Sequence, residues 1–251
     1  MVAVLTAHSG LRPEAKRYIM AGRGVVVDVG GRGDFSALQD ACDYWAGRGT
    51  GGRIFLREGV HSPCVVSQDD VSIIGSGHAA IIDGAAAAHA VKVTGDRVLV
   101  ADLQAKTTAG SGTAFSPIRA EGAAYCTYRN LYISGSDGIG VNLISSSSNS
   151  AVLGCRLDPI DEEGLTLSSP YCRAEGNLVG NTGSVGIHVT ATGDGAVITG
   201  NVVGITANDG IMIEAGGDNC LVVGNKIDQW TNEAIDDNSG TSTVASNETT
   251  V

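Results

Sequence analysis

The sequence predicts an all-β solenoid of stacked parallel strands, and two repeated patterns carry this prediction. In the first pattern a short apolar run is followed by Asn, as in 196–203 and 220–227. This Asn recurs at intervals of 24, 24 and 22 residues, at positions 177, 201, 225 and 247. In the second pattern, a Gly-Ile-x-Val phrase such as Gly186–Val189 keeps step with the first. Repeats this short cannot bury an apolar face alone, so each must stack on its neighbours.

The composition favours a narrow interior over a conventional globular core. The 251 residues include 36 Gly and only 4% aromatic residues, yet 43% are hydrophobic. The formal net charge of −11 argues against nucleic acid as a partner, because a phosphate-binding surface needs clustered Lys and Arg. Residues 1–6 lack the basic start of a signal peptide, and no apolar run reaches the ~18 residues of a membrane span.

The cysteine pattern predicts free thiols. The six Cys residues lack the C-x-x-C spacing of zinc sites. Cys126, Cys172 and Cys220 fall in one repeat column, alternating with Ala151 and Ala196. Members two turns apart are separated by about 9.6 Å, whereas a disulfide needs Cα atoms within ~7 Å. We therefore expect buried free thiols and folding in a reducing cytoplasm.

The chain divides into three segments of different character. Residues 1–24 form an N-terminal arm with a short helix expected inside it, and residues 25–52 form an entry segment. Residues 53–251 hold the repeats, with room for about eight turns of 24 residues. A polar insertion at 107–124 interrupts them, and loops of this length on a regular solenoid often mark a working face.

The entry segment predicts a strand followed by a helix that caps the solenoid. Val25 to Val29 form the strand, and Asp34 offers an N-cap to the helix. Such a helix would shield the edge strands of the first turn, which otherwise invite aggregation. Its apolar face comprises Phe35, Leu38, Ala41, Cys42 and Trp45.

Four short motifs follow one another from residue 33 to residue 77. They are Gly33-Asp34-Phe35, Gly51-Gly52-Arg53-Ile54-Phe55-Leu56, Gly59-Val60-His61 and Val71-Ser72-Ile73-Ile74-Gly75-Ser76-Gly77. In this order they resemble the entry of right-handed parallel β-helix proteins of the pectate-lyase-like superfamily. With the repeats, the resemblance covers roughly residues 25–251. It implies a single-stranded right-handed parallel β-helix with an N-terminal capping helix, but not an activity, since function depends on sites carried by the fold.

One column of the repeats is rich in Asn. Asn tolerates left-handed turns, and stacked side-chain amides hydrogen-bond from one turn to the next. We interpret the column as a structural ladder rather than a catalytic site. Its members are Asn130, Asn177, Asn201, Asn225 and Asn247, with Cys155 interrupting.

A second column is acidic. The residue before each Gly-Ile-x-Val phrase is Asp137, Glu163, Val185, Asp209 or Glu233. Asp209 and Glu233 belong to adjacent turns, so we expect them to lie ~5 Å apart. Carboxylates that close raise one another's pKa, which allows an acid/base pair or a divalent-cation site, with calcium as the cofactor. The alternative is that these side chains only solvate the turns before Gly, and no dedicated metal-ligand set is predicted.

The sequence offers three catalytic candidates, which belong to the enzyme hypothesis alone, and three candidates for glycan binding. Glycoside hydrolysis needs two carboxyl groups at ~5 to 9.5 Å, and an exposed indole stacks on sugar rings. The catalytic candidates are Asp209, Glu233 and Asp236. The candidates for glycan binding are His188, in an outward column, Trp230, in a turn, and Asp237.

Comparison with the superfamily weakens the enzyme hypothesis. Its lyases use an Arg or Lys base facing carboxylates that hold calcium. The basic residues after the Asn column, Arg156 and Lys226, lie three turns apart, and neither shares the acidic column. Its polygalacturonase-like hydrolases use Gly-His-Gly and Arg-x-Lys, and the chain contains neither motif.

Two functions follow from these observations. The favoured one is a virion structural protein, of the phage tail-spike or capsid-decoration type, that folds in the host cytoplasm. We expect it to be a homotrimer that contacts other virion proteins through residues 1–24 and surface polysaccharide through its turns. The alternative is an extracellular polysaccharide lyase or glycoside hydrolase with an acidic groove.

Overall fold

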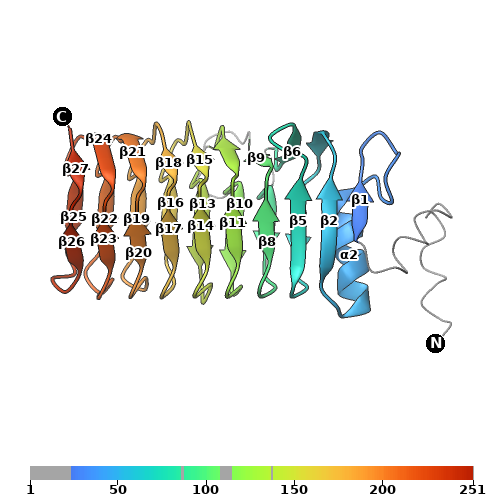
Figure 1. Ribbon diagram of the computed structural model, residues 1–251, viewed down its shortest axis with the longest axis horizontal. Helices are drawn as coiled ribbons and strands as arrows, with labels where there is room; N and C mark the ends of the chain where they lie inside the picture. Colours follow the sequence, from blue (N-terminus) through green and yellow to red (C-terminus); the bar gives the residue numbers. More distant parts are fainter. Residues whose placement is uncertain (1–23, 86–87, 108–114, 137, 251) are drawn as a thin grey trace.

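The computed structural model describes residues 24–85, 88–107, 115–136 and 138–250, and these form a parallel β-helix. Three sheets run along the molecule, and every strand in them pairs in parallel with its neighbour (Figure 1). The chain passes through sheets A, B and C in turn, so one strand from each makes a coil. The predicted solenoid is therefore confirmed, with about eight turns.

The strands are short, with two to five residues each, as expected for short apolar runs between turns. Sheet A consists of β1 (Val25–Val27), β2 (Gly52–Leu56), β5 (Val71–Gly75), β8 (Leu99–Ala101), β11 (Thr127–Arg129), β14 (Ala151–Leu153), β17 (Arg173–Glu175), β20 (Val197–Thr199), β23 (Leu221–Val223) and β26 (Thr243–Ala245). Sheet B consists of β3 (Gly59–His61), β6 (Ala80–Asp83), β9 (Gln104–Lys106), β12 (Tyr132–Ser134), β15 (Arg156–Leu157), β18 (Leu178–Val179), β21 (Val202–Ile205), β24 (Lys226–Gln229) and β27 (Glu248–Thr249). Sheet C consists of β4 (Cys64–Val66), β7 (Val91–Val93), β10 (Ile118–Glu121), β13 (Val141–Ile144), β16 (Leu165–Leu167), β19 (Ile187–Val189), β22 (Ile211–Ile213) and β25 (Ile235–Asp237).

The core is a set of columns in which small and β-branched side chains stack on their equivalents. In sheet A, Val152, Ala174, Ile198 and Val222 are paired in register and all fully buried. Their neighbours along each strand point outward, because successive side chains of a strand face opposite sides. The 24-residue repeat is thus the length of chain that brings Ile198 beside Val222.

The Asn ladder is confirmed over its last four members. The Asn201 side chain donates from Nδ2 to Asn225 Oδ1 at 2.9 Å and to the Ala174 carbonyl at 2.8 Å. Its own Oδ1 accepts from the backbone N–H and the Nδ2 of Asn177, both at 2.9 Å. Cys155 takes the preceding place, as predicted, and its N–H donates to Asn177 Oδ1.

Two column assignments were wrong by one residue. Asn130 is not in the ladder; it is exposed, with φ 49°, at the left-handed position that Gly154 fills one coil later. The buried Leu131 takes the ladder position instead. In the Cys column, Ser150 rather than Ala151 lies between Cys126 and Cys172, and its Oγ accepts from the Cys126 N–H. All six cysteines are buried free thiols, as predicted.

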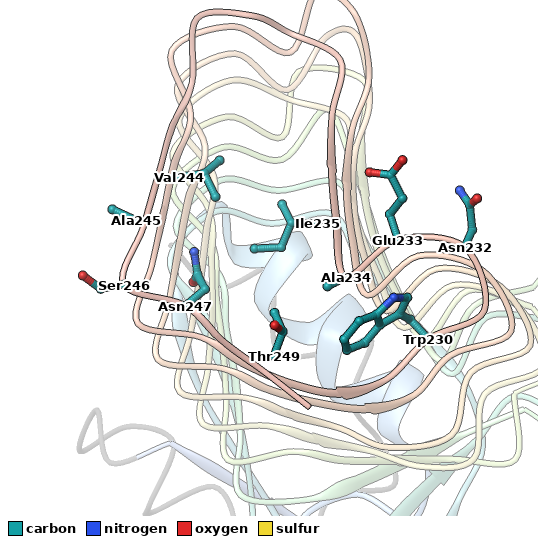
Figure 2. A pocket seen from close by; sticks show the side chains of 10 residues that line it. All are labelled: Trp230, Asn232, Glu233, Ala234, Ile235, Val244, Ala245, Ser246, Asn247 and Thr249. Carbon is teal, nitrogen blue, oxygen red and sulfur yellow. The ribbon is translucent and has the colours of Figure 1, made fainter. Parts of the chain in front are cut away.

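The helix α2 (Leu38–Arg48) closes the N-terminal end and packs against β1, β2 and β4. Figure 1 shows it beside the first coil, and Figure 2 shows it across the far end of the coils. Trp45 lies on Gly52, where a Cβ atom would come within 2.2 Å of the indole. The predicted N-cap was wrong: Ala37 holds that position, and Asp34 Oδ2 instead accepts from Val26 N at 2.7 Å.

Two predicted segments are only partly described. The arm at 1–24 and its helix fall outside the described residues except for Gly24. The polar insertion at 107–124 is shorter than predicted, since its residues 118–121 form β10, paired on both sides in sheet C. Residues 108–114 fall outside the described part of the chain.

The last coil exposes its interior positions. Val244 continues the column of Val222 but is 41% exposed. Asp237 and Thr249 continue the inward columns of Ile213 and Ile227, so polar side chains replace buried Ile there. Figure 2 looks onto this end, where Ile235, Val244 and Thr249 surround the opening.

The Asn ladder generates the first prediction. Replacing Asn201 with Ala leaves the Asn177 N–H and one of the two Nδ2 hydrogens of Asn177 without an acceptor, and it removes the side-chain donor of the Ala174 carbonyl. We expect the free energy of unfolding to fall by about 3 kcal/mol, measured by urea denaturation. Asn130→Gly is the matched control, because Gly suits the left-handed conformation; it should change stability by only about 0.5 kcal/mol. Equal losses in the two variants would contradict a special role for the ladder.

Candidate functional site

The outward face of sheet C carries a row of mostly polar side chains that runs from coil to coil. Each strand of the sheet except β4 contributes one outward residue, and the strand register places each beside the next. We call this row the sheet C column. Its members are Lys92, Arg119, Asn142, Thr166, His188, Met212 and Asp236.

His188 forms the centre of the column, held between two carboxylates from different coils. Its Nδ1 lies 2.8 Å from Glu163 Oε1, and its Nε2 lies 3.1 Å from Glu214 Oε1. Glu163 precedes β16 and also accepts from Thr166 Oγ1, while Glu214 follows β22 and accepts from the Ala191 N–H at 2.9 Å. Because carboxylates only accept, both ring nitrogens must donate, and His188 is an imidazolium in this arrangement.

The electrostatics of the cluster agree with its geometry. Burial alone lowers the pKa of His188, but the hydrogen bond and charge of Glu163, then those of Glu214, outweigh it and raise this pKa above 6.5. Burial likewise raises the pKa of Glu163, but the bonds from His188 and Thr166 lower it overall. The His188 side chain is 11% exposed and Glu214 38% exposed, so the cluster opens to solvent at Glu214.

The end of the sheet C column that lies nearer the N-terminus is basic. Lys92 Nζ lies 2.9 Å from Glu121 Oε2, and Arg119 Nε lies 3.3 Å from the same oxygen. The hydrogen bonds from Lys92 and Arg119 lower the pKa of Glu121. Two cations therefore share one carboxylate, which leaves an excess of positive charge at this end.

Asn142 lies in the sheet C column between the basic end and the His188 cluster, and one of its side-chain atoms makes no hydrogen bond within the described part of the chain. It lies between Arg119 and Thr166 in the register and is 7% exposed. Its Oδ1 is buried without a partner among the described residues. A buried amide oxygen normally has a partner, since leaving one unsatisfied costs free energy. Among the described residues, this atom is therefore an unsatisfied acceptor, buried on the outward side of sheet C.

The predicted catalytic carboxylates have separate roles. Asp209 is 1% exposed, and its Oδ1 accepts from Asn232 Nδ2 at 2.8 Å and from the Glu233 N–H at 2.9 Å. Glu233 is exposed at the C-terminal end of the β-helix. Asp236 lies at the end of the sheet C column, beside Met212, and accepts from Asn238 Nδ2.

The predicted glycan-binding residues are not brought together either. His188 faces outward, as expected. Trp230 is half-buried against the core and lines an open depression of about 550 Å³ at the last coil (Figure 2). Asp237 occupies an inward position, and its Oδ1 accepts from the N–H and Oγ of Ser239. The alternation of Ile235, Asp236 and Asp237 along β25 was the signal that places Asp237 inward.

Sequence analysis missed most of the sheet C column. Glu214 lies directly after a Gly-Ile-x-Val phrase, but nothing in the sequence indicates that it reaches back to His188. Within the described residues, no three His, Cys, Asp or Glu side chains are grouped so as to bind a metal ion. No helix in the same part of the chain is long and apolar enough to cross a membrane.

Comparison with known proteins identifies the fold. Residues 66–227 match the model of a family described as right handed beta helix region. No curated protein matches the sequence.

Several solved structures are similar. An alginate lyase from Paenibacillus sp. str. FPU-7 is 17% identical, with a TM-score of 0.59 over 85% of this chain and 93% of that chain. A pectin methylesterase variant in complex with a hexasaccharide is 12% identical, with a TM-score of 0.58 over 82% of this chain and 80% of that chain. A protein of Geobacillus virus E2 is 11% identical, with a TM-score of 0.51 over 84% of this chain and 56% of that chain. At these identities the likeness shows the fold alone.

The cluster around His188 predicts a defined pH dependence of stability. Because the folded pKa of His188 is raised, its contribution is fully present below pH 6.5 and is lost as pH rises through the folded value. Because the folded pKa of Glu163 is lowered, its contribution is present above pH 4.5 and is lost as pH falls through the folded value. We expect a plateau of the melting temperature between these limits.

Two variants test this origin of the pH dependence. At pH 6, Glu163→Gln should lower the free energy of unfolding by about 2 kcal/mol, since a charged hydrogen bond is lost. His188→Gln should remove the decline of the melting temperature on the alkaline side. His78→Gln is the matched control, because His78 is exposed; it should leave the profile unchanged. An alkaline decline that persists in His188→Gln would refute the assignment.

Proposed function

The chain belongs to the right-handed β-helix family, and on this premise we propose that it binds a polysaccharide on the outer face of sheet C. The observation that carries the proposal is the Glu163–His188–Glu214 cluster in line with the cations of Lys92 and Arg119. Adjacent coils lie ~4.8 Å apart, so the column presents donors and acceptors at regular intervals along a straight line. An extended polymer of sugar units matches such a line better than a compact ligand does.

The chemistry of the column supports a ligand with carboxyl as well as hydroxyl groups. Lys92 and Arg119 share one carboxylate and leave positive charge at one end. Glu163 and Glu214 accept hydrogen bonds at the centre, where hydroxyl groups of a sugar would donate. Two structures of the same fold have names that specify alginate and pectin, and one of them holds a hexasaccharide. These names support a polysaccharide as the class of ligand.

We favour binding over cleavage. Hydrolysis of a glycosidic bond needs two carboxyl groups facing the same substrate. Asp209 is buried and engaged by Asn232 and Glu233, so it is not available to a ligand in this conformation. Both ring nitrogens of His188 are occupied by carboxylates. The enzyme alternative has Asp209, Glu233 and Asp236 as catalytic residues. It would be recognised by the formation of new chain ends in a product assay.

A combined binding and product assay tests the proposal. The full chain is run through gels that contain alginate, polygalacturonate or a neutral glucan, and the same mixtures are assayed for unsaturated and reducing ends. We expect retardation by an acidic polysaccharide, weakened about tenfold in Arg119→Gln, because a cation that can bond the ligand is removed. A similar loss is expected in His188→Gln, because Glu163 and Glu214 are no longer held in place by the imidazolium between them. No new chain ends should form.

The controls separate the possible outcomes. Glu58→Gln changes an exposed carboxylate away from the column and should not alter the retardation. Retardation that is equal in the wild type and in Arg119→Gln would reject the sheet C column as the binding surface. New chain ends that disappear in Asp209→Ala and Glu233→Ala would replace binding by the enzyme alternative.

A second function, display on a virus particle, is favoured by a different observation. Six buried free cysteines suit a protein that folds in a reducing cytoplasm. The likeness to a protein of Geobacillus virus E2 supports the same context. We propose that the chain is a virion protein, of the tail-spike or capsid-decoration type, which assembles as a homotrimer. Residues 1–24 would then attach it to other virion proteins.

Light scattering tests the trimer. The full chain has a mass of 25.5 kDa, so a homotrimer at micromolar concentration should scatter as a particle of three times that mass. A mass equal to that of one chain, unchanged on concentration, would contradict the trimer but not polysaccharide binding.

A further inference from the structure

The corner that leads from sheet C into sheet A holds a column of residues with left-handed backbone. The register of sheet A places one such residue on each of seven successive coils. We call it the corner column. Its members, all with φ between 55° and 68°, are Asp70, Arg97, Tyr125, Asn149, Tyr171, Gly195 and Asn219.

A ladder of backbone hydrogen bonds imposes this conformation. Tyr125 N donates to the Ser148 carbonyl at 2.9 Å, and Tyr171 N donates to the Asp194 carbonyl at 2.8 Å. Asp70, Arg97, Asn149 and Gly195 donate to a carbonyl of the next coil in the same way, and Asn219 N donates to Thr241 Oγ1 at 3.1 Å. The conformation is therefore set by the stacking of the coils, and the side chain at each position has to accept it.

Tyr125 and Tyr171 are poorly suited to these positions. Gly, Asn and Asp adopt the left-handed region readily, whereas a bulky side chain there is strained. Burial does not offset the strain, because Tyr125 is 61% exposed and Tyr171 57% exposed. Strained residues that gain little within the fold are found at sites where the side chain has a task. The two rings are the feature that needs an explanation.

The chain provides a support for the ring of Tyr171. Gly195 occupies the same column one coil later, and a Cβ atom there would lie 2.7 Å from Tyr171 Cδ1 and 2.8 Å from Cε1. The ring thus lies against the backbone of the next coil, in space that only glycine leaves open. It is positioned rather than freely rotating, which lowers the entropy lost when a ligand binds.

The two rings are aligned along the molecule. Tyr125 and Tyr171 are two coils apart, with Asn149 between them, so their backbones are separated by about 10 Å parallel to the axis. A single extended chain of sugar units lying along the corner can stack on both. Aromatic rings offer an apolar face for such stacking and, in Tyr, a hydroxyl at the edge.

The charges around the corner column favour a neutral sugar chain. Arg97 is neutralised by Asp69 and Asp70, with contacts of 3.1 and 2.7 Å. On the far side, Asp194 accepts from Asn219 Nδ2 at 3.1 Å and forms no ion pair within the described part of the chain. An anionic polysaccharide would be repelled by these carboxylates, in contrast to the basic end of the sheet C column.

We propose that Tyr125 and Tyr171 form a second carbohydrate site, which stacks on the rings of a neutral hexose chain lying along the corner column. The site lies on a different column from Glu163 and His188, so the proposal for this site can fail without affecting the proposal for sheet C. Asn149, between the rings, and Asp194, beside Gly195, supply polar groups for sugar hydroxyls.

Ring-labelled tyrosine in the full chain tests this site. Cellohexaose, maltohexaose and a mannan hexasaccharide serve as neutral probes, and a galacturonate hexasaccharide serves as the anionic one. We expect a neutral probe to shift the ring signals of Tyr125 and Tyr171 together and saturably. The buried Tyr44 and Tyr128 are internal controls and should not respond.

Two substitutions at each position separate stacking from structure. Tyr125→Asn and Tyr171→Asn remove a ring but suit the left-handed backbone, so the melting temperature should hold or rise. Each should weaken binding at least about fivefold, and the double variant should abolish it. Tyr125→Phe and Tyr171→Phe keep the ring and should retain most of the affinity. Glu163→Gln should leave the response unchanged.

Several results would overturn the proposal. These are the absence of a response to every neutral probe, a stronger response to the galacturonate hexasaccharide, or a Phe variant that binds as weakly as the Asn variant. A change in molecular mass in Tyr125→Asn or Tyr171→Asn would show that the rings contact another copy of the chain instead. A response that the Asn variants leave intact would place the sugar elsewhere.

Discussion

The structure depends on one constraint, which is that each coil lies in register on the coil before it. Backbone hydrogen bonds between coils fix the register, and the Asn201–Asn225 contact holds it inside the helix as well. Because parallel strands stack at ~4.8 Å, every residue lies beside its equivalent in the next repeat. A shift of one residue would turn Ile198 outward and bring Val197 or Thr199 inward, so the register is strongly specified. All functional surfaces of the molecule are consequences of this stacking.

Stacking turns distant residues into neighbours and so builds surfaces that no single repeat contains. Glu163, His188 and Glu214 come from three coils, and their contact exists only because β16, β19 and β22 lie side by side. The same rule aligns Tyr125 with Tyr171 along a corner where the backbone is left-handed. The two columns differ in character, since one is polar with an excess of base at one end and the other is aromatic with carboxylates around it. A rigid helix can therefore present several unlike binding lines in parallel.

The sequence predicts the fold well because the fold is encoded by its own repetition. The four Asn at 177, 201, 225 and 247 are sufficient to set the coil length, and the buried face of α2 follows from its apolar spacing. Errors arose where one residue type serves two purposes: Asn130 suits a left-handed turn and a ladder equally, so its column slipped by one place. Asp209 looked like a catalytic acid because the sequence does not show that Asn232 and Glu233 use its oxygen. Glu214 could not be assigned, since its role depends on how far a side chain reaches across a coil boundary.

The inward carboxylate of the last coil has a consequence for molecules that meet end to end. Asp237 continues the column of Leu167, Val189 and Ile213, so a further layer that carried an apolar residue in this column would lie directly against its carboxylate. Packing an apolar strand of a second molecule on this coil would bury the Asp237 carboxylate without a cation beside it. Burying an unpaired charge in this way costs free energy. Open solenoid ends otherwise act as templates for unlimited fibre growth. The Asp237 carboxylate thus favours a covering layer that brings a hydrogen-bond donor or a cation to it, and it disfavours the stacking of identical apolar layers.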